Sequence, residues 1–359
     1  MSLIARYLIG NIVRTTLFTL LALLSLFAFF DVLGELSALG RHHYDWKTML
    51  TVVALYIPGH VYQLLPLAVL IGSLAAFTLL AASSEYAVIR TSGVSARYIS
   101  LILLMVGGGF AVVTFLMGEF VAPKAEQEAE RLYLQATRSV VAQDFRSGLW
   151  VKDDNHFINV KTMLPDNTLL NVRIYQYDQD YRLTAVQEAN RGLYQGEDKW
   201  LLQEVRTTYF GADSTRIEHQ AERIWQSVLR PEILDVLLVV PEKMSAMNLF
   251  SYIEHLKNNK QKTSRYEIAL WGKLFYPLAC LSMAIIAVGF TPANQRQVSL
   301  GYRLFIGIVI GLSFHFLNRL IGHLGLLYQW QPILITLMPT VLFLTGGLAL
   351  LFYRERYSV

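Results

Sequence analysis

The side chains in this sequence that could do chemistry are few. His42 and His43, followed by Asp45, carry the imidazole and carboxylate groups that ligate zinc, but no further ligand stands at a known metal-site spacing. The sequence also contains no H-E-x-x-H zinc motif, no G-x-S-x-G nucleophile turn and no G-x-x-x-x-G-K-[ST] phosphate loop. We therefore expect no metal site and no catalytic residues, and we interpret 42–45 as a hydrated loop beside a membrane.

A second set of polar side chains lies within strongly apolar stretches. Lys273 stands near the start of one stretch, and His315 and Arg319 stand near the end of another. Exposing Lys or Arg to lipid at the bilayer centre costs about 2.5–3.5 kcal/mol, so such groups usually face a bundle interior or a cavity. Near a helix end, however, Lys273 and Arg319 could extend their charged ends to the membrane surface. The sequence leaves both alternatives open.

The composition is that of a membrane protein. Of the 359 residues, 54% are hydrophobic and only 16% are charged, whereas soluble domains are about 25% charged. The net charge is +4, but the sequence has no Lys/Arg-rich run of the kind that tracks phosphates, so nucleic acid is not an expected partner. The single cysteine, Cys280, cannot form an intramolecular disulfide.

Six apolar segments have the length needed to hold these residues in a bilayer. A span needs about 20 mostly apolar residues to cross about 30 Å of hydrocarbon. The segments are 15–30 and 304–317, each with its flanks, and 48–84, 99–118, 269–290 and 333–352. The second segment is longer than one span and contains Pro58 and Pro66. It therefore predicts a short interfacial helix or a kinked lead-in, followed by a span that ends near Leu80.

The polar block 125–265 separates three predicted spans from the other three. Within it, residues 156–161 and 170–175 alternate apolar and polar side chains, which predicts strands. Because an antiparallel sheet can bury one face and solvate the other, we expect a sandwich or open roll over 149–240.

The end of the polar block predicts a helix. Residues 247–256 place Leu249, Ile253 and Leu256 on one helical face, as in an amphipathic helix that leads into the fourth span. A connector lying on the membrane surface is the alternative. The chain thus divides into 1–124 with spans one to three, 125–265 with the β domain and connecting helix, and 266–359 with spans four to six.

The charge distribution orients the spans. Short cytoplasmic loops of membrane proteins carry the excess of Lys and Arg. If the N-terminus is inside, the cytoplasmic segments hold Arg6, Arg14, Arg90, Arg97, Arg296, Arg303, Arg354 and Arg356 against only Glu85 and Glu355. The opposite short loops hold Arg41, Lys47 and Arg319 against Asp31, Glu35 and Asp45. Both termini are therefore expected inside, and the β domain outside.

The loop after the second span carries the sharpest local signal. Ser83 or Ser84 can cap a short helix, Glu85 in its first turn complements the positive end of the helix dipole, and Gly93 can end it. A short capped helix at the cytoplasmic face is suited to docking a soluble partner. An ordinary interfacial connector remains the alternative.

Several stretches of the sequence match a known family. They are L-P-L at 65–67, I-G-S-L at 71–74, S-E through T-S-G at 84–93, G-E-F-V-A-P at 118–123, G-L-W-V-K-D at 148–153, R-Y at 265–266, W-G-K-L-F at 271–275, Pro277 and G-Y-R at 301–303. In this order, on a plan of three spans, an insert and three spans, the chain resembles the lipopolysaccharide export permeases LptF and LptG. It is more similar to the LptG branch.

The resemblance implies a non-catalytic permease subunit of an ABC transporter in the bacterial inner membrane. Such a permease extracts lipopolysaccharide from the outer leaflet and passes it to a periplasmic bridge. The implied partners are an LptF-type permease, a dimeric LptB-type ATPase and an LptC-type single-span bridge protein. ATP and Mg²⁺ would bind to the ATPase, and this chain would bind no cofactor. The insert between the two sets of spans would be a periplasmic β-jellyroll.

The resemblance also assigns roles to individual residues. The segment 83–92 becomes the coupling helix, with Ser84, Glu85, Tyr86, Ile89 and Arg90 as its site residues and Glu85 seated in the ATPase. Spans one and five line a lateral opening for the lipid. The predicted lining is Leu24, Phe27, Phe30, Phe305, Ile308, Leu312, His315, Phe316 and Arg319. Plain contact with membrane lipid is the alternative for these apolar faces.

The chain departs from the family beyond span one. LptG relatives can carry lysines there, whereas this chain has Asp31 and Glu35. Arg41 and Lys47, with His42 and His43 between them, are the predicted substitutes that would contact the phosphates of the lipid.

A membrane-anchored envelope sensor or receptor with an extracytoplasmic β domain is the main alternative function. A sensor would usually need a cytoplasmic output domain, and none follows Arg354. A membrane enzyme acting on lipid or envelope polymer is a further alternative, which the missing catalytic residues disfavour.

Overall fold

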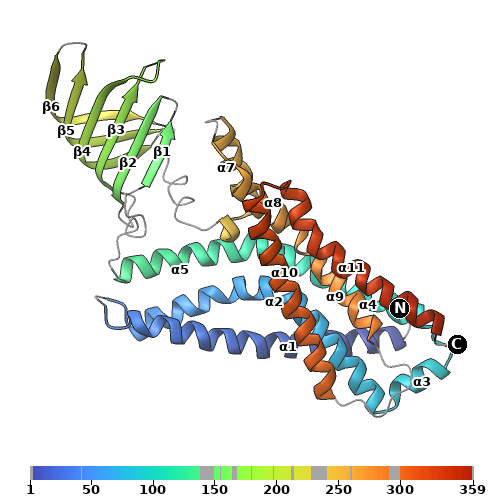
Figure 1. The fold of residues 1–359 in the computed structure, drawn as a ribbon. Coiled ribbons are helices and arrows are strands. Elements are labelled where there is room, and N and C mark those ends of the chain that lie inside the picture. The colour runs from blue at the N-terminus through green and yellow to red at the C-terminus, as the bar shows by residue number, and fades with distance from the viewer. Residues whose placement is uncertain are drawn as a thin grey trace.

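The computed structural model describes residues 3–41, 43–137, 149–153, 155–163, 168–178, 180–196, 198–211, 214–227, 241–258, 261–290 and 300–357. Two groups of helices flank a β-sheet in the chain order, and the sheet lies beyond one end of the helices (Figure 1). His42, Gly148, Arg296 and the side chains of Arg354, Glu355 and Arg356 lie outside what the structure describes.

The helices before the sheet form one group, and those after it form another. The first group is α1 (Leu3–Glu35), η1 (Leu36–Ala38), α2 (Trp46–Ala82), α3 (Glu85–Thr91), α4 (Ala96–Leu116), the π-helical η2 (Met117–Val121) and α5 (Ala122–Thr137). The second group is η3 (Pro241–Lys243), α7 (Ala246–Asn258), α8 (Ser264–Phe275), α9 (Leu278–Gly289), α10 (Leu300–Leu327) and α11 (Pro332–Tyr357).

Five of the described helices are long and apolar enough to cross a membrane. They are α1 with η1, α2, the run from α4 to α5, α10 and α11. The helices α8 and α9 meet the same criterion only as a pair, which is bent by 50° at the break. Pro277 stands at the start of α9, where its missing N–H and fixed φ are tolerated, and it interrupts the predicted fourth span.

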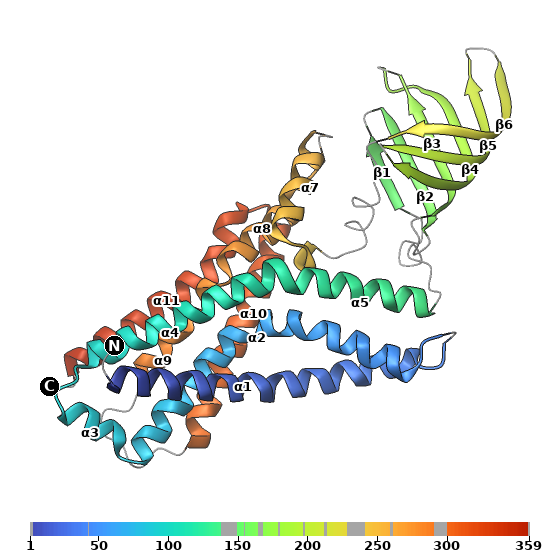
Figure 2. The ribbon, with the colours of Figure 1, turned by 180° about the vertical axis from the view of Figure 1, so that it is seen from behind.

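The second predicted span is a single helix. α2 runs without interruption from Trp46 to Ala82 through Pro58 and Pro66, so a separate interfacial helix is wrong. Its ribbon changes direction partway along, as the kinked alternative requires (Figures 1 and 2). Asp45 caps the helix by accepting a hydrogen bond from the Thr48 backbone N–H at 2.8 Å.

The third predicted span continues well beyond Gly118. From Ala96 the chain stays helical through η2 and α5 to Thr137, so the expected boundary at residue 124 falls inside a helix. The extension is amphipathic, and its apolar face packs against the loop and helix ends between α1 and α2. In this cluster Tyr44 is fully buried against Ala129 and Ala136, which explains why the helix does not stop at the end of the apolar run.

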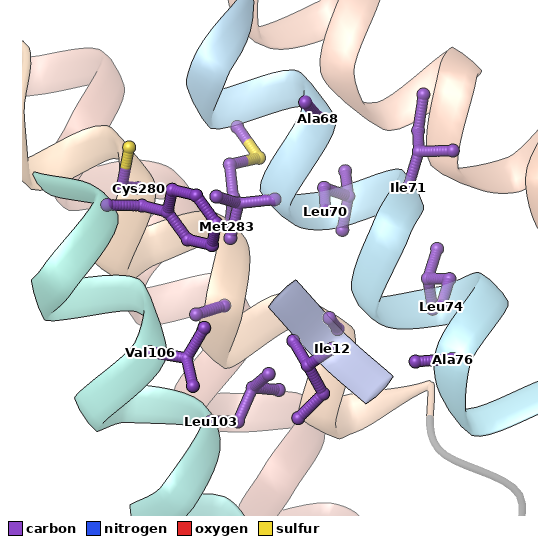
Figure 3. Close-up of a cluster of buried hydrophobic side chains, with 14 of the residues drawn as sticks. Ile12, Ala68, Leu70, Ile71, Leu74, Ala76, Leu103, Val106, Cys280 and Met283 are labelled. Atoms are coloured by element: carbon purple, nitrogen blue, oxygen red, sulfur yellow. The ribbon is translucent and has the colours of Figure 1, made fainter. Parts of the chain in front are cut away.

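The core of the helical part lies where α1, α2, α4 and α9 meet. Figure 3 shows Ile12 of α1 among side chains of α2 and α4, with Cys280 and Met283 of α9 beside them. Cys280 is buried and free, as the sequence requires of a single cysteine. Arg303, which charge counting placed among the cytoplasmic arginines, is also buried here, and its Nη1 donates to Thr78 Oγ1 at 3.3 Å.

The described strands form one antiparallel sheet. They are β1 (Leu149–Asp153), β2 (His156–Met163), β3 (Leu169–Tyr177), β4 (Leu183–Gly196), β5 (Lys199–Phe210) and β6 (Thr215–Gln226). Each strand pairs with the next, in the order β1-β2-β3-β4-β5-β6. The alternation at 156–161 and 170–175 thus correctly predicted strands. Trp200 of β5 is fully buried in a cluster of apolar side chains from β1 to β5. The sheet is curved (Figure 2).

The helix after the sheet forms as its pattern predicts. Leu249, Ile253 and Leu256 of α7 are all buried, and Leu249 and Leu256 share a cluster with Tyr266 of α8. The helix therefore packs on α8 with its apolar face.

The two ends of the molecule differ. The N- and C-termini lie near α3 at one end, and the sheet lies at the other end (Figures 1 and 2). At 1.5 Å per residue the 37 residues of α2 extend about 55 Å, more than the roughly 30 Å of hydrocarbon in a bilayer. The α2 helix thus either tilts or projects from the membrane.

Candidate functional site

The short helix α3 is held at the end of the molecule farthest from the sheet. Ser84 occupies its N-cap position with a φ of +63°, and its side chain makes no capping hydrogen bond. The Ser83 hydroxyl donates instead to the Leu79 carbonyl of α2 at 3.1 Å. The predicted serine cap is therefore wrong. Gly93, directly after the C-cap residue, has the φ of +93° that favours glycine and ends the helix as expected.

One face of α3 packs against the bundle. Ile89 is buried in the main core, and the ring of Tyr86 lies edge-on to Phe77 of α2 at 6.2 Å. The other face is outward, where Val88 is 65% exposed. Arg90 is exposed as well, and its Nη1 donates to the Val94 carbonyl at 2.9 Å. The helix thus presents a small surface while being fixed to α2 from below.

Glu85 lies between the two faces and contacts α1. The hydroxyl of Tyr7 donates a hydrogen bond to Glu85 Oε2. Tyr7 is not among the predicted site residues, because no local pattern links positions 7 and 85. The structure therefore joins the start of α1 to the start of α3.

The helices α1 and α10 pack on the same turn of α2. Gly72 of α2 faces Thr16 of α1 so closely that an added Cβ would lie 2.4 Å from the Thr16 Cα. On the other side, a Cβ added to Gly307 of α10 would lie 2.9 Å from Leu74 Cδ1. Gly311, one turn further along α10, also packs on α2. Small residues let the helix backbones approach closely, as in other membrane helix pairs.

The predicted lining residues of α1 and α10 divide into two groups. Leu24 and Phe27 pack partly against the bundle core, and the Phe27 ring lies 5.2 Å from the His60 ring. The exposed side chains are Phe30, Phe305, Ile308, Leu312 and Phe316. The exposed group forms apolar faces on both helices that suit lipid or a partner helix.

The polar residues predicted inside the spans also differ in how exposed they are. Arg319 is exposed, whereas His315 is half-buried beside the ring of Phe314 at 5.9 Å. Lys273 is only 8% exposed, and its Nζ donates to the Met244 carbonyl. Of the two alternatives, Lys273 faces the bundle interior.

Asp31 and Glu35, the acidic residues near the C-terminal end of α1, both have partners within the chain. Asp31 Oδ2 lies 2.6 Å from His60 Nε2 of α2. Glu35 accepts a hydrogen bond from the Tyr44 hydroxyl at 2.8 Å. Burial, and then the hydrogen bond to Glu35, raise the pKa of Tyr44 well above its usual range, so the hydroxyl stays protonated and donates. These carboxylates therefore fix the C-terminal end of α1.

The loop between α1 and α2 carries the predicted basic substitutes. Arg41 lies in this loop and Lys47 in the first turn of α2, and both are exposed. Asp45 Oδ1 accepts hydrogen bonds from the Thr48 backbone N–H and hydroxyl, and these hydrogen bonds lower the pKa of Asp45. Among the described residues, no group of three or more His, Cys, Asp and Glu side chains could hold a metal ion.

Comparison with known proteins places the chain among membrane permeases. The family model described as lipopolysaccharide export system permease LptF/LptG matches residues 6–354. A relative from Haemophilus influenzae, named lipopolysaccharide export system permease protein LptG, is 28% identical over 340 residues, which cover 94% of this chain and 95% of the relative. A relative of the same name from Escherichia coli K12 is 29% identical over 352 residues, which cover 98% of each chain.

Proposed function

Because the chain belongs to the lipopolysaccharide export system permease LptF/LptG family, it is a transmembrane permease subunit of that system, and we propose that it extracts lipopolysaccharide from the outer leaflet of the inner membrane and passes it to a periplasmic bridge. The match over 6–354 carries this conclusion, since it covers both groups of helices and the sheet. An envelope sensor is not favoured.

We propose six spans, with the bent pair α8 and α9 as the fourth. The termini and α3 then face the cytoplasm, and the sheet faces the periplasm. Their positions at opposite ends of the molecule support this orientation (Figures 1 and 2). Arg90 and Arg97, which flank the loop after α3, agree with the excess of basic residues on cytoplasmic loops.

In this proposal α3 couples the permease to a dimeric LptB-type ATPase, which binds ATP and Mg²⁺. Val88 and Arg90 on the outward face would contact the ATPase, together with Glu85. Ile89 and Tyr86 support the role from the opposite side, because they fix α3 to the core and to α2. A displacement of α3 would therefore be passed to α2, and through α2 to both α1 and α10.

The exposed faces of α1 and α10 would form the lateral opening together with an LptF-type permease. Extraction of a lipid exposes its apolar surface to water, which costs about 25 cal/mol of free energy per Å². Apolar side chains that replace the membrane around the lipid avoid this cost. Phe30 of α1 and Phe305, Leu312 and Phe316 of α10 are exposed aromatic and aliphatic groups of that kind.

The sheet would act as one segment of the periplasmic bridge. We propose that it belongs to a jellyroll-like domain whose curled apolar face shields acyl chains. The strands at the ends of the described sheet, β1 and β6, offer backbone groups that could pair with the β domain of an LptC-type protein.

Labelling of single cysteines with a membrane-impermeant maleimide tests the orientation. Thr215→Cys on β6 and Val88→Cys on α3 are matched exposed sites on elements at opposite ends of the molecule. In spheroplasts, Thr215→Cys should be labelled at once and Val88→Cys only after lysis. The reverse order would place the sheet in the cytoplasm and overturn the export route. Purification of the wild-type complex should in addition yield a stoichiometric soluble ATPase, whose absence would contradict the coupling role.

A further inference from the structure

The described residues from Pro241 onward, after the sheet, make a charged junction with the helices. Residues 243–247, here called the anchor, join η3 to the first turn of α7. Met244, its second residue, is fully buried. The anchor makes three contacts that involve a charged side chain, each with a different helix of the bundle.

The first contact is made by Glu119 of η2. Its Oε2 accepts a hydrogen bond from the Ala246 backbone N–H at 2.7 Å, and its Oε1 accepts from the Met247 N–H at 3.2 Å. The first N–H groups of a helix lack partners within it and carry a partial positive charge, so a carboxylate stabilises them. Ser245 Oγ accepts a hydrogen bond from the Asn248 N–H at 3.1 Å. Glu119, 127 positions earlier in the chain than Ala246, thus completes the cap of α7 by accepting from the two N–H groups before it.

The second contact is made by Lys273 of α8. Its buried ammonium donates to the Met244 carbonyl and lies 5.9 Å from the centre of the Tyr62 ring of α2. Burial of an ammonium group without hydrogen-bond partners is energetically costly. The hydrogen bond to the Met244 carbonyl therefore stabilises both Lys273 and the anchor.

The third contact is made from within the anchor. Lys243 Nζ lies 5.4 Å from the centre of the Tyr56 ring of α2. The anchor therefore touches α2, η2 and α8, which belong to both halves of the transmembrane part. No motion of one half against the other can leave all three contacts unchanged.

The backbone around Glu119 is shaped for this contact. A π-helical turn, which is rare and frequent at functional sites, spans Met117–Val121. Gly118 within it lies so close to Tyr62 that an added Cβ would be 2.5 Å from Tyr62 Cε2. The Tyr62 ring in turn packs on Tyr276 at 4.9 Å. The direction of the Glu119 side chain is thus set by packing between the two halves.

From these contacts we infer that the anchor is the mechanical link between bundle and sheet, with Glu119 and Lys273 as positioning residues that pass a rearrangement of the transmembrane helices to the β domain. The inference rests on the proposed function, since it requires a nucleotide-driven rearrangement. Release of the Glu119 cap should leave the helix bundle responsive to nucleotide and the sheet unresponsive.

Two pairs of spin labels in the complete complex separate these steps. The gate pair, Ser25→Cys on α1 and Ser313→Cys on α10, reports the bundle. The sheet pair, Gln135→Cys on α5 and Thr215→Cys on β6, reports the β domain. All four sites are exposed, and the native Cys280 is buried, so it can stay. Distances are compared with ATP and after vanadate trapping of the ATPase.

The variants are Glu119→Ala, Glu119→Gln and, as a matched control, Glu128→Ala, an exposed carboxylate on α5. In the wild type and the control, both pairs should change distance with nucleotide. In Glu119→Ala, the distance within the gate pair should still change with nucleotide, and ATP hydrolysis should persist. The distance distribution of the sheet pair should broaden and no longer change with nucleotide. Glu119→Gln keeps one acceptor oxygen, so it should show an intermediate sheet response in a folded protein.

A sheet pair that follows nucleotide in both Glu119 variants as it does in the wild type would overturn the anchor's role. A gate pair that ignores nucleotide in the wild type would instead overturn the proposed function, and the inference with it. The two failures are therefore distinguishable.

Discussion

The Asp31 carboxylate of α1 lies 2.6 Å from Nε2 of His60 in α2, and the two side chains are only 23% and 18% exposed. The Phe27 ring packs on the same imidazole. Together with the hydrogen bond from Tyr44 to Glu35, this contact ties the outer end of α1 to its neighbours. Each end of α1 thus has a polar contact with another helix, at Glu85 of α3 on one side and at His60 of α2 on the other.

Replacement of Asp31 by Ala should loosen the outer end of α1. Loss of one partner of a largely buried charged hydrogen bond costs about 1–3 kcal/mol, because His60 loses its acceptor. Thermal unfolding of the purified protein should show this loss. Glu128→Ala, which removes an exposed carboxylate, should change stability far less. Equal stability of the two variants would contradict the structural role of the Asp31–His60 pair.

Gly72→Ala should destabilise the crossing of α1 and α2. The new methyl group would lie 2.4 Å from the Thr16 Cα, and backbone atoms cannot rotate away as a side chain can. Overpacking of this kind costs about 1–3 kcal/mol. Gly10→Ala is the control, because no atom lies within 4 Å of its added Cβ. Size-exclusion chromatography after heating should show loss of folded protein for Gly72→Ala alone. Survival of both variants to the same temperature would argue against the close crossing.

The stability of the α1–α2 loop should depend on alkaline pH through Tyr44. Burial raises the pKa of Tyr44, so the folded protein keeps a proton that the unfolded chain releases near its usual pKa of about 10. The contribution of the hydroxyl is complete below about pH 10 and is lost as pH rises above that value.

Comparison of thermal unfolding at about pH 8 and about pH 10.5 measures this effect. The wild type should lose more stability between the two values than Tyr44→Phe does. Tyr181→Phe removes the hydroxyl of a tyrosine that is 76% exposed and should behave as the wild type. An identical loss in wild type and Tyr44→Phe would show that Tyr44 does not govern the dependence.

Glu85→Ala and Glu85→Lys should weaken assembly with the ATPase or ATP-driven lipid extraction. A charge-assisted hydrogen bond contributes about 1.5–3 kcal/mol, so its loss should reduce ATPase affinity about 10- to 100-fold. Tyr7→Phe, which removes the intramolecular donor to Glu85, separates its contact with α1 from its contact with the ATPase. Glu128→Ala, which removes an exposed carboxylate on α5, is the control. Wild-type transport by both Glu85 variants would refute the assigned role.

Replacement of Arg41 and Lys47 together should reduce cross-linking of lipopolysaccharide at the outer end of α1. Both side chains are exposed there, while Asp31 and Glu35 have partners within the chain. Arg131→Ala, an exposed arginine on α5, controls for the loss of positive charge. Unchanged cross-linking and transport in the double variant would exclude these residues as phosphate contacts.

The sequence by itself determined those elements whose pattern repeats within one segment. The uncharged run at 48–84 predicted a membrane helix, the alternation at 170–175 predicted β3, and the spacing of Leu249, Ile253 and Leu256 predicted the buried face of α7. These patterns are local because polar and apolar residues alternate along one segment with the period of its helix or strand, so the segment's own residues show which face is buried.

Only the tertiary structure decided how these elements meet. It paired Tyr7 with Glu85 and Asp31 with His60, and it placed Glu119 at the start of a helix 127 residues further along the chain. It also showed that the third helix continues to Thr137, since the face that stabilises this extension is buried by another part of the chain. A polar side chain meets its partner only when helices from distant parts of the sequence pack together, so the residues beside it in the sequence do not predict that partner.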